Sequence, residues 1–171
     1  MNAIFGYCCS PAEWETLRRM LDLPLPEEID EYPLDEENCQ SAYDSLCASG
    51  ILTPAGDRVL VDRLYTFLLD SISSSDWCIA CHTESRQAQL YRMTDLMVLC
   101  EWTASQCSMT PLDNTESARE TLENAILRCT APLTISLRQG GSTESAAYSS
   151  PETASRAALQ MLHSFSSLTR E

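Results

Sequence analysis

Five consecutive residues carry the most recognisable chemical pattern of the chain, Cys78-Ile79-Ala80-Cys81-His82. The spacing C-x-x-C-H is the attachment signature of a c-type haem, and C-x-x-C at the start of a helix is typical of redox thiols. Apolar residues alternate along this segment, which predicts a strand, and residues three apart in a strand point to opposite faces. Cys78 and Cys81 are therefore interpreted as ordinary strand residues rather than as ligands of a haem or a metal.

The other residue types that support catalysis or metal binding lack the spacing that their chemistry requires. A zinc site needs a second C-x-x-C or H-x3-H pair, and the adjacent Cys8 and Cys9 form a poor chelating pair. The chain has two histidines, His82 and His163, no G-x-S-x-G elbow and no lysine for a phosphate-binding loop. We therefore expect no enzyme activity, cofactor or metal. If the protein is nevertheless an enzyme, the alternative is one with a cysteine nucleophile.

The chain is strongly acidic, with 25 acidic and 11 basic residues and a formal net charge of −14. Binding to nucleic acid requires clustered basic side chains, so this charge argues against nucleic acid and against an anionic membrane surface as partners. Seven of the acids fall between Glu27 and Glu37, where there is no base. This segment is either a solvated loop or a contact for a basic partner.

The nine cysteines bear on the cellular compartment. The first residues lack the pattern of a secretory signal, and no apolar run reaches the roughly 18 residues of a membrane span. An odd number of cysteines also disfavours a closed disulfide framework. We therefore expect reduced thiols, a cytoplasmic location and no membrane contact.

The N-terminal part predicts helices and a small hairpin. Ser10 and Glu13 form a capping box for a first helix, and a second helix is expected over 36–49. Two short apolar runs around a Pro/Gly turn predict a wing-like hairpin over 51–61, before a helix over 62–73. The apolar stripe of that third helix is expected to contain Leu64, Tyr65, Leu68, Leu69 and Ile72. This winged-helix-like order makes a winged-helix regulator an alternative function, although the segment that would read DNA, residues 38–49, has no base.

The rest of the chain predicts a sheet and two further helices. Strands over 77–82, 87–93 and 96–103 are expected to form an antiparallel meander. Residues 111–114 are expected to open a helix, followed by a strand near 133–138, a Gly/Ser/Thr-rich mobile linker over 139–149, and a terminal helix that starts at Ser150. Residues 1–171 are therefore expected to form one α+β domain, a small antiparallel sheet flanked by helices with a winged-helix-like N-terminal segment.

Three blocks, 42–52, 61–69 and 77–80, have a familiar order of apolar residues and turns. A helix ends in Leu46-Cys47-Ala48-Ser49-Gly50-Ile51-Leu52, a helix that opens with Val61-Asp62 follows, and a strand then enters the sheet. Over residues 42–104 the chain resembles the EspG family of secretion-associated chaperones of type VII (ESX) secretion. The resemblance implies a non-enzymatic protein that binds the tip of a helical secretion substrate with a sheet hairpin and nearby helices.

The resemblance places the partner site at the turn between the second and third strands, at Met93, Thr94, Asp95, Leu96 and Met97. Two methionines beside a tight turn form an adaptable apolar surface that suits a helix. The alternative is that Met93 and Met97 fill the core. The sequence thus favours a non-catalytic protein-binding adaptor or chaperone-like protein of the cytoplasm, linked through the resemblance to type VII secretion.

Overall fold

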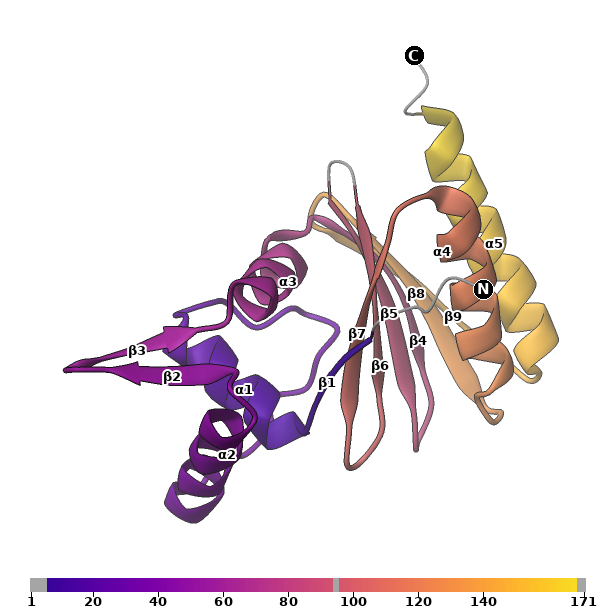
Figure 1. Cartoon of the computed structure of the whole chain (residues 1–171). Coiled ribbons are helices and arrows are strands. Elements are labelled where there is room, and N and C mark those ends of the chain that lie inside the picture. The colour runs from indigo at the N-terminus through magenta and orange to yellow at the C-terminus, as the bar shows by residue number, and fades with distance from the viewer. Residues whose placement is uncertain (1–5, 94–95, 169–171) are drawn as a thin grey trace.

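The computed structural model describes residues 6–93 and 96–168, and within them the chain has the expected α+β fold (Figure 1). The elements in chain order are β1 (Tyr7–Cys9), α1 (Pro11–Met20), α2 (Glu36–Ala48), β2 (Leu52–Ala55), β3 (Arg58–Val61), α3 (Arg63–Ser74), β4 (Trp77–His82), β5 (Gln87–Arg92), β6 (Met97–Trp102), β7 (Cys107–Leu112), α4 (Thr115–Leu127), β8 (Leu133–Gln139), β9 (Ser142–Tyr148) and α5 (Pro151–Leu168).

The described strands form a seven-stranded antiparallel sheet in the order β1-β7-β6-β5-β4-β8-β9 and a separate hairpin of β2 and β3. Strands β4 to β7 follow one another as a meander, which extends the expected three strands by one. After α4 the chain returns to the other side of β4, where β8 pairs with it. In the resulting register Ile79 of β4 lies between Leu90 of β5 and Leu137 of β8.

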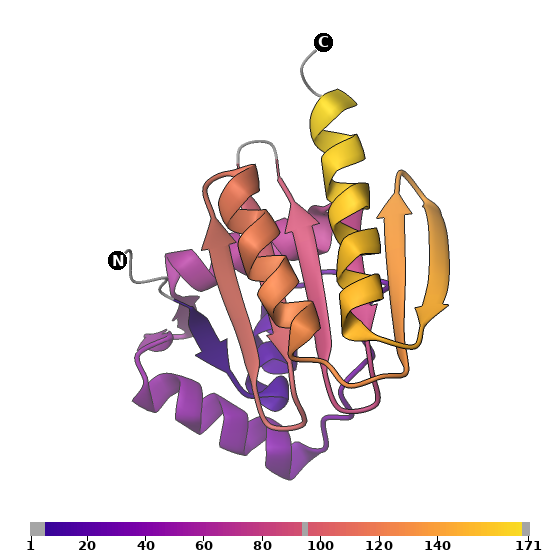
Figure 2. The same ribbon diagram turned by 90° about the vertical axis from the view of Figure 1, so that its right-hand side faces the viewer.

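Both faces of the sheet are covered, and each face has its own core. Cys78 and Ala80 belong to the core beneath α1 and α3, whereas Trp77, Ile79 and Cys81 belong to the core beneath α4 and α5. Figure 2 shows α4 and α5 lying side by side across the second face. The alternation expected for residues 77–82 is therefore confirmed, and it serves two apolar layers because a strand presents successive side chains to opposite faces.

Helix starts follow the local sequence closely. Ser10 Oγ accepts from the Glu13 amide at 3.1 Å, and the Ser10 amide donates to Glu13 Oε2 at 2.6 Å, so the expected capping box is confirmed. Asp62 caps α3 by accepting from the Leu64 amide at 2.9 Å. The wing-like hairpin is also present: β2 and β3 are joined by Gly56 and Asp57 and project away from the sheet (Figure 1).

The expected linker over 139–149 is wrong, because this segment forms the second half of a hairpin. Strand β9 pairs with β8 along its whole length, from Gln139↔Ser142 to Leu133↔Tyr148. Gly140 and Gly141 have φ values of 54° and 83°, which is the backbone that a two-residue hairpin turn requires. The glycines and hydroxyl residues that suggest a linker are here a tight turn and a polar edge strand.

The helix expected to open over residues 111–114 is present, but it begins only at the end of this range. Pro111 lies in β7, and α4 begins after Asn114, whose side chain accepts from the Ser117 amide at 2.8 Å. A proline is tolerated at this place because β1 pairs only with Cys107–Met109, so that β7 is an edge strand beyond them. Short β1 and the start of β7 carry no clear alternating pattern, and the sequence did not predict either strand.

Candidate functional site

Exposed apolar side chains gather on α3 and on the strand before it. Leu64 and Phe67 are 52% and 48% exposed, and Leu60 at the end of the wing hairpin is exposed as well. Leu64 was expected in the buried stripe; it instead lies outward with Phe67, three residues further along the same helix, while Tyr65, Leu68, Leu69 and Ile72 are buried as expected. Clustered exposed apolar side chains mark interaction surfaces more often than scattered ones do.

A cavity of about 340 Å³ lies beside Phe67, between α3 and the turn that follows α1. We call it the α3 groove. Its lining consists of Leu21, Leu23, Arg63, Thr66, Phe67 and Asp70. Apolar side chains from two elements thus form its walls, and one basic and one acidic residue of α3 contribute the charged part of the lining.

The turn after α1 fixes the position of Leu21 and Leu23. The Leu23 amide donates to Arg18 O and the Asp22 amide to Arg19 O, both at 3.1 Å, which is the hydrogen-bond pattern of a Schellman motif. Asp22 occupies the left-handed position of this motif, with φ 52°. A glycine is usual there because a side chain at positive φ crowds the backbone.

Replacing Asp22 by Gly is expected to raise the free energy of unfolding by about 0.5–1 kcal/mol. The glycine relieves the left-handed conformation, and loss of the carboxylate removes a negative charge from the C-terminal end of the α1 dipole. Urea titration at neutral pH measures the change. Asp22→Ala is the matched control: it removes the same charge but keeps a Cβ, so a gain as large as that of Asp22→Gly would contradict the strain.

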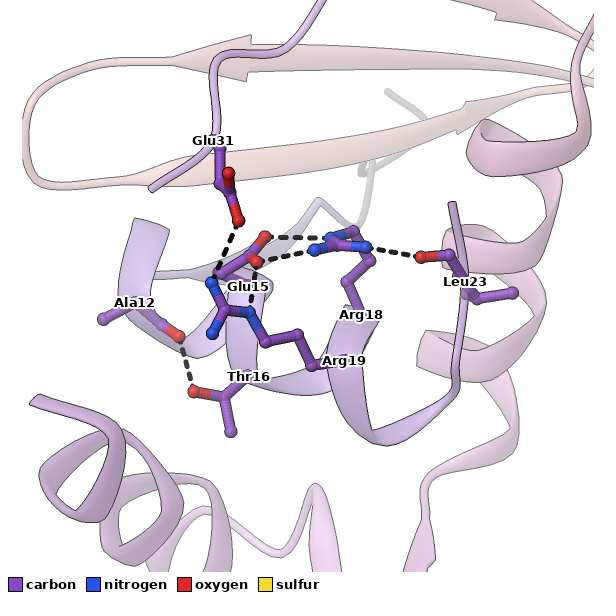
Figure 3. Close-up of polar contacts among 7 residues, drawn as sticks. All are labelled: Ala12, Glu15, Thr16, Arg18, Arg19, Leu23 and Glu31. Carbon is purple, nitrogen blue, oxygen red and sulfur yellow. Dashed lines mark hydrogen bonds and ion pairs between the residues drawn. The ribbon is translucent and has the colours of Figure 1, made fainter. Parts of the chain in front are cut away.

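A buried carboxylate holds this turn in place (Figure 3). The side chain of Glu15 is 1% exposed and accepts from Arg18 Nε at 2.9 Å, Arg18 Nη2 at 2.6 Å and Arg19 Nε at 2.6 Å. Arg18 Nη1 in turn donates to the carbonyl oxygen of Leu23 at 2.5 Å. Glu15 therefore holds the Arg18 guanidinium in place, and the hydrogen bond from Arg18 to Leu23 positions one wall of the α3 groove.

The electrostatics of this cluster favour the ionised form of Glu15. Burial opposes ionisation, but the hydrogen bonds and charges of Arg18 and Arg19 together outweigh it and lower the pKa of the Glu15 carboxyl. The same contact raises the pKa of the Arg18 guanidinium. Both groups are therefore charged at neutral pH.

The acidic segment 27–37 is only partly solvated. Glu28 is 6% exposed and forms an ion pair with Arg138 of β8, and Arg138 Nη1 also donates to Ser75 O at 2.8 Å. Ile29 is buried in the first core, and Glu31 pairs with Arg19 at 3.2 Å. Glu28 thus attaches the segment to the sheet and Glu31 attaches it to α1, while Glu27 and Asp30 are exposed.

The predicted hairpin-tip site lies at the turn between β5 and β6. Met93 and Leu96 are half-buried against the first core, and Met97 is half-buried against the second. The two methionines therefore lie on opposite faces of the sheet and do not form one surface. Thr94 and Asp95 lie outside the described residues, and partner binding at this tip stays a prediction.

The sequence analysis did not single out Phe67, Leu21 or Leu23 as site residues. The signal that was available is the width of the apolar pattern on α3, which exceeds what one face of a helix can bury. Leu23 precedes Pro24, and Leu21 lies two residues before Leu23; the proline indicated only the end of a helix.

The C-x-x-C-H segment does not bring its two cysteines together. Cys78 and Cys81 lie on opposite faces of β4, and burial raises the pKa of the Cys78 thiol well above its ordinary value. Burial lowers the pKa of His82, against the opposing effect of Asp30 and Glu28. Among the described residues no three His, Cys, Asp or Glu side chains are grouped to hold a metal ion. Nor is any helix in this part of the chain both long and apolar enough to cross a bilayer.

Comparison with known proteins does not indicate a function. No protein-family model matches the chain, and no curated protein shows significant similarity to it.

Proposed function

We propose that this protein is a non-catalytic adaptor or chaperone-like protein that receives an apolar helical segment of a protein partner in the α3 groove. The observation that carries the proposal is the exposure of Leu64 and Phe67 beside a cavity walled by Leu21 and Leu23. Large apolar side chains in water are unfavourable, and covering them is the main driving force of protein association.

The shape of the groove favours a helix as its occupant. Leu64 and Phe67 form a short apolar row along α3, and the cavity beside them accommodates a large apolar side chain of a partner. An amphipathic helix presents such side chains at positions i, i+3, i+4 and i+7, which match a row of this kind. An aromatic residue at the edge of the cavity is the type of residue that commonly dominates binding energy.

Charge favours a partner with basic residues beside its apolar face. Asp70 lines the groove and Asp22 and Asp62 are exposed close to it in the chain, against the single lining base Arg63. The whole chain carries a net charge of −14. This charge accelerates encounter with a basic segment and disfavours an acidic one.

The resemblance to type VII secretion chaperones supports a more specific form of the proposal. The stretch over which the chain resembles them, residues 42–104, spans the second half of α2, the β2–β3 hairpin and α3, and one of the three resembling blocks, 61–69, contains Leu64 and Phe67. In this form the protein is a cytoplasmic chaperone, and the occupant of the groove is a helical secretion substrate. The β5–β6 tip is the competing position for the same partner.

Phe67→Asp is expected to weaken partner binding by about 30-fold, because it removes a central apolar contact worth about 2 kcal/mol and introduces a charge. The partner is first captured from native cells and identified by mass spectrometry. Its helical segment is then titrated into the purified chain by calorimetry. Phe67 is half exposed, so the thermal midpoint of the variant is expected to change little.

Leu127→Asp is the matched control, because Leu127 is 44% exposed but lies on α4, in the opposite helical layer. Its affinity for the segment is expected to equal that of the unaltered chain. Met93→Asp tests the competing site. Loss of binding in Met93→Asp with full binding in Phe67→Asp would move the site to the β5–β6 tip, and equal loss in Leu127→Asp would reject a specific surface.

A further inference from the structure

Two cysteines from distant parts of the chain meet in the second core. Cys81 lies in β4, an interior strand of the sheet, and Cys129 directly follows Arg128, the C-cap residue of α4; their Sγ atoms are 3.9 Å apart. The Cys81 thiol donates to Cys129 Sγ, and the Cys129 thiol in turn donates to the carbonyl oxygen of Ala125 at 3.5 Å. The two sulfurs are within reach of each other without being bonded.

A pocket of about 200 Å³ reaches Cys129, whereas Cys81 lies behind it in the core. Cys129 forms part of its wall, together with Arg86 from the β4–β5 turn and Arg128 from the end of α4. Glu101 of β6 also lines it and pairs with Arg128 at 2.5 Å. Gln106 and Arg128 are exposed at its rim, so a small molecule from solvent can enter.

We propose that Cys129 and Cys81 form a peroxide-reactive dithiol, in which Cys129 reacts with a small hydroperoxide in this pocket and Cys81 then closes a disulfide. The two arginines provide the positive environment that a reactive thiolate requires, and the pocket provides access. The inference is independent of the α3 groove, which lies on the other side of the sheet.

The chemistry balances with the hydroperoxide ROOH as the oxidant. The Cys129 thiolate attacks one peroxide oxygen; an S–O bond forms, the O–O bond breaks, and the alkoxide takes a proton and leaves as ROH. Cys81 Sγ then attacks the sulfenic sulfur of Cys129; the S–S bond forms, the S–O bond breaks, and the leaving hydroxide takes the Cys81 proton to give water. Two thiols are thus oxidised to one disulfide while the peroxide is reduced to ROH and water.

The electrostatics distinguish Cys129 from the other buried thiols. The hydrogen bond from Cys81 and the charges of Arg86 and Arg128 outweigh burial and Glu101, and they lower the pKa of Cys129 to about 7. Burial instead raises the pKa of Cys78, Cys100 and Cys107. A thiolate at neutral pH is therefore favoured at Cys129 among these residues.

The local structure permits the closure. A disulfide requires the sulfurs to approach to about 2.05 Å. Cys81 is held in β4 between β5 and β8. Cys129 is followed by the exposed residues 130–132, which connect α4 to β8, so the approach requires movement at Cys129 and leaves the sheet in place.

The test treats the full-length chain with hydrogen peroxide at neutral pH, alkylates the remaining thiols and identifies linked peptides by mass spectrometry. The expected product is a peptide pair joined through Cys81 and Cys129. In Cys81→Ser, dimedone is expected to label Cys129 as a sulfenic acid. A disulfide between Cys9 and Cys107, which face each other across β1 and β7, or oxidation confined to the exposed Cys8 and Cys39, would overturn the proposal.

A second measurement does not depend on the folding of cysteine variants. Arg86→Gln combined with Arg128→Gln is expected to slow peroxide oxidation of Cys129 about fivefold at pH 7, because a rise of its pKa by about one from the value near 7 lowers the thiolate fraction from about one half to about one tenth. Arg119→Gln, on the exposed face of α4 outside the pocket, is the matched control and is expected to react like the unaltered chain. Equal rates in all three chains would contradict an arginine-stabilised thiolate.

Discussion

Replacing Arg138 by Met is expected to lower the free energy of unfolding by about 3–5 kcal/mol. Glu28 is nearly inaccessible to solvent, so the substitution leaves its carboxylate buried without a counter-charge. The carbonyl oxygen of Ser75 loses its donor as well. Urea denaturation at neutral pH, followed by the fluorescence of the three tryptophans, measures the loss.

The combined variant Glu28→Leu/Arg138→Met separates the missing counter-charge from lost packing. It is expected to be more stable than Arg138→Met alone, since no isolated charge remains and an apolar pair can replace a buried ion pair. Arg119→Met provides a surface arginine for comparison and is expected to change stability by less than about 0.5 kcal/mol. Simple additivity of Glu28→Leu and Arg138→Met would contradict the proposed coupling of the two residues.

The second large effect is expected for Glu15→Ala, at about 2–4 kcal/mol of lost stability. The substitution leaves Arg18 largely buried without its carboxylate and loosens its hydrogen bond to Leu23, so partner binding in the α3 groove should weaken as well. Arg19 keeps access to solvent, which places the expected loss below that of Arg138→Met. Glu31→Gln, which removes only the exposed partner of Arg19, is the control and should cost little.

The pH dependence of this effect has a defined sign. The folded-state pKa of Glu15 is lowered, so its ionised form stabilises the fold at every pH above the ordinary carboxyl value near 4.5. That contribution disappears as the pH falls through the lowered pKa. The stability difference between the unaltered chain and Glu15→Ala should therefore be constant from pH 7 to about pH 5 and shrink below pH 4. A difference that grows on acidification would contradict the ionised cluster.

Local signals predicted much of the fold. The capping box of Ser10 and Glu13 is complete within four residues, and the alternation of residues 77–82 is visible within six, so neither required knowledge of distant contacts. Strand β9 escaped prediction because it lies at an edge, where exposed polar side chains show no apolar alternation. Gly140 and Gly141, which precede β9, are typical of a linker as well as of a tight turn, so these residue types alone do not distinguish the two.

The contacts that define the sites join residues far apart in the chain, and no local sequence pattern indicates them. Glu28 and Arg138 are 110 residues apart, and Cys81 and Cys129 are 48 apart. The C-x-x-C pattern suggests Cys78 as the partner of Cys81, but the strand places these two side chains on opposite faces of the sheet. Phe67 has the same apolar character as the buried residues beside it; only the packing of α3 decides which of them faces water.

The shared sheet ties the two helical layers into a single cooperative unit. Strands β4, β5 and β6 contribute alternate side chains to both cores, so each backbone ladder that opens exposes apolar surface on both sides at once. Neither helical layer can therefore lose its supporting sheet while the other layer stays intact. We therefore expect partial opening to begin at the periphery, at the separate β2–β3 wing hairpin and at the polar edge strand β9, rather than within the shared strands.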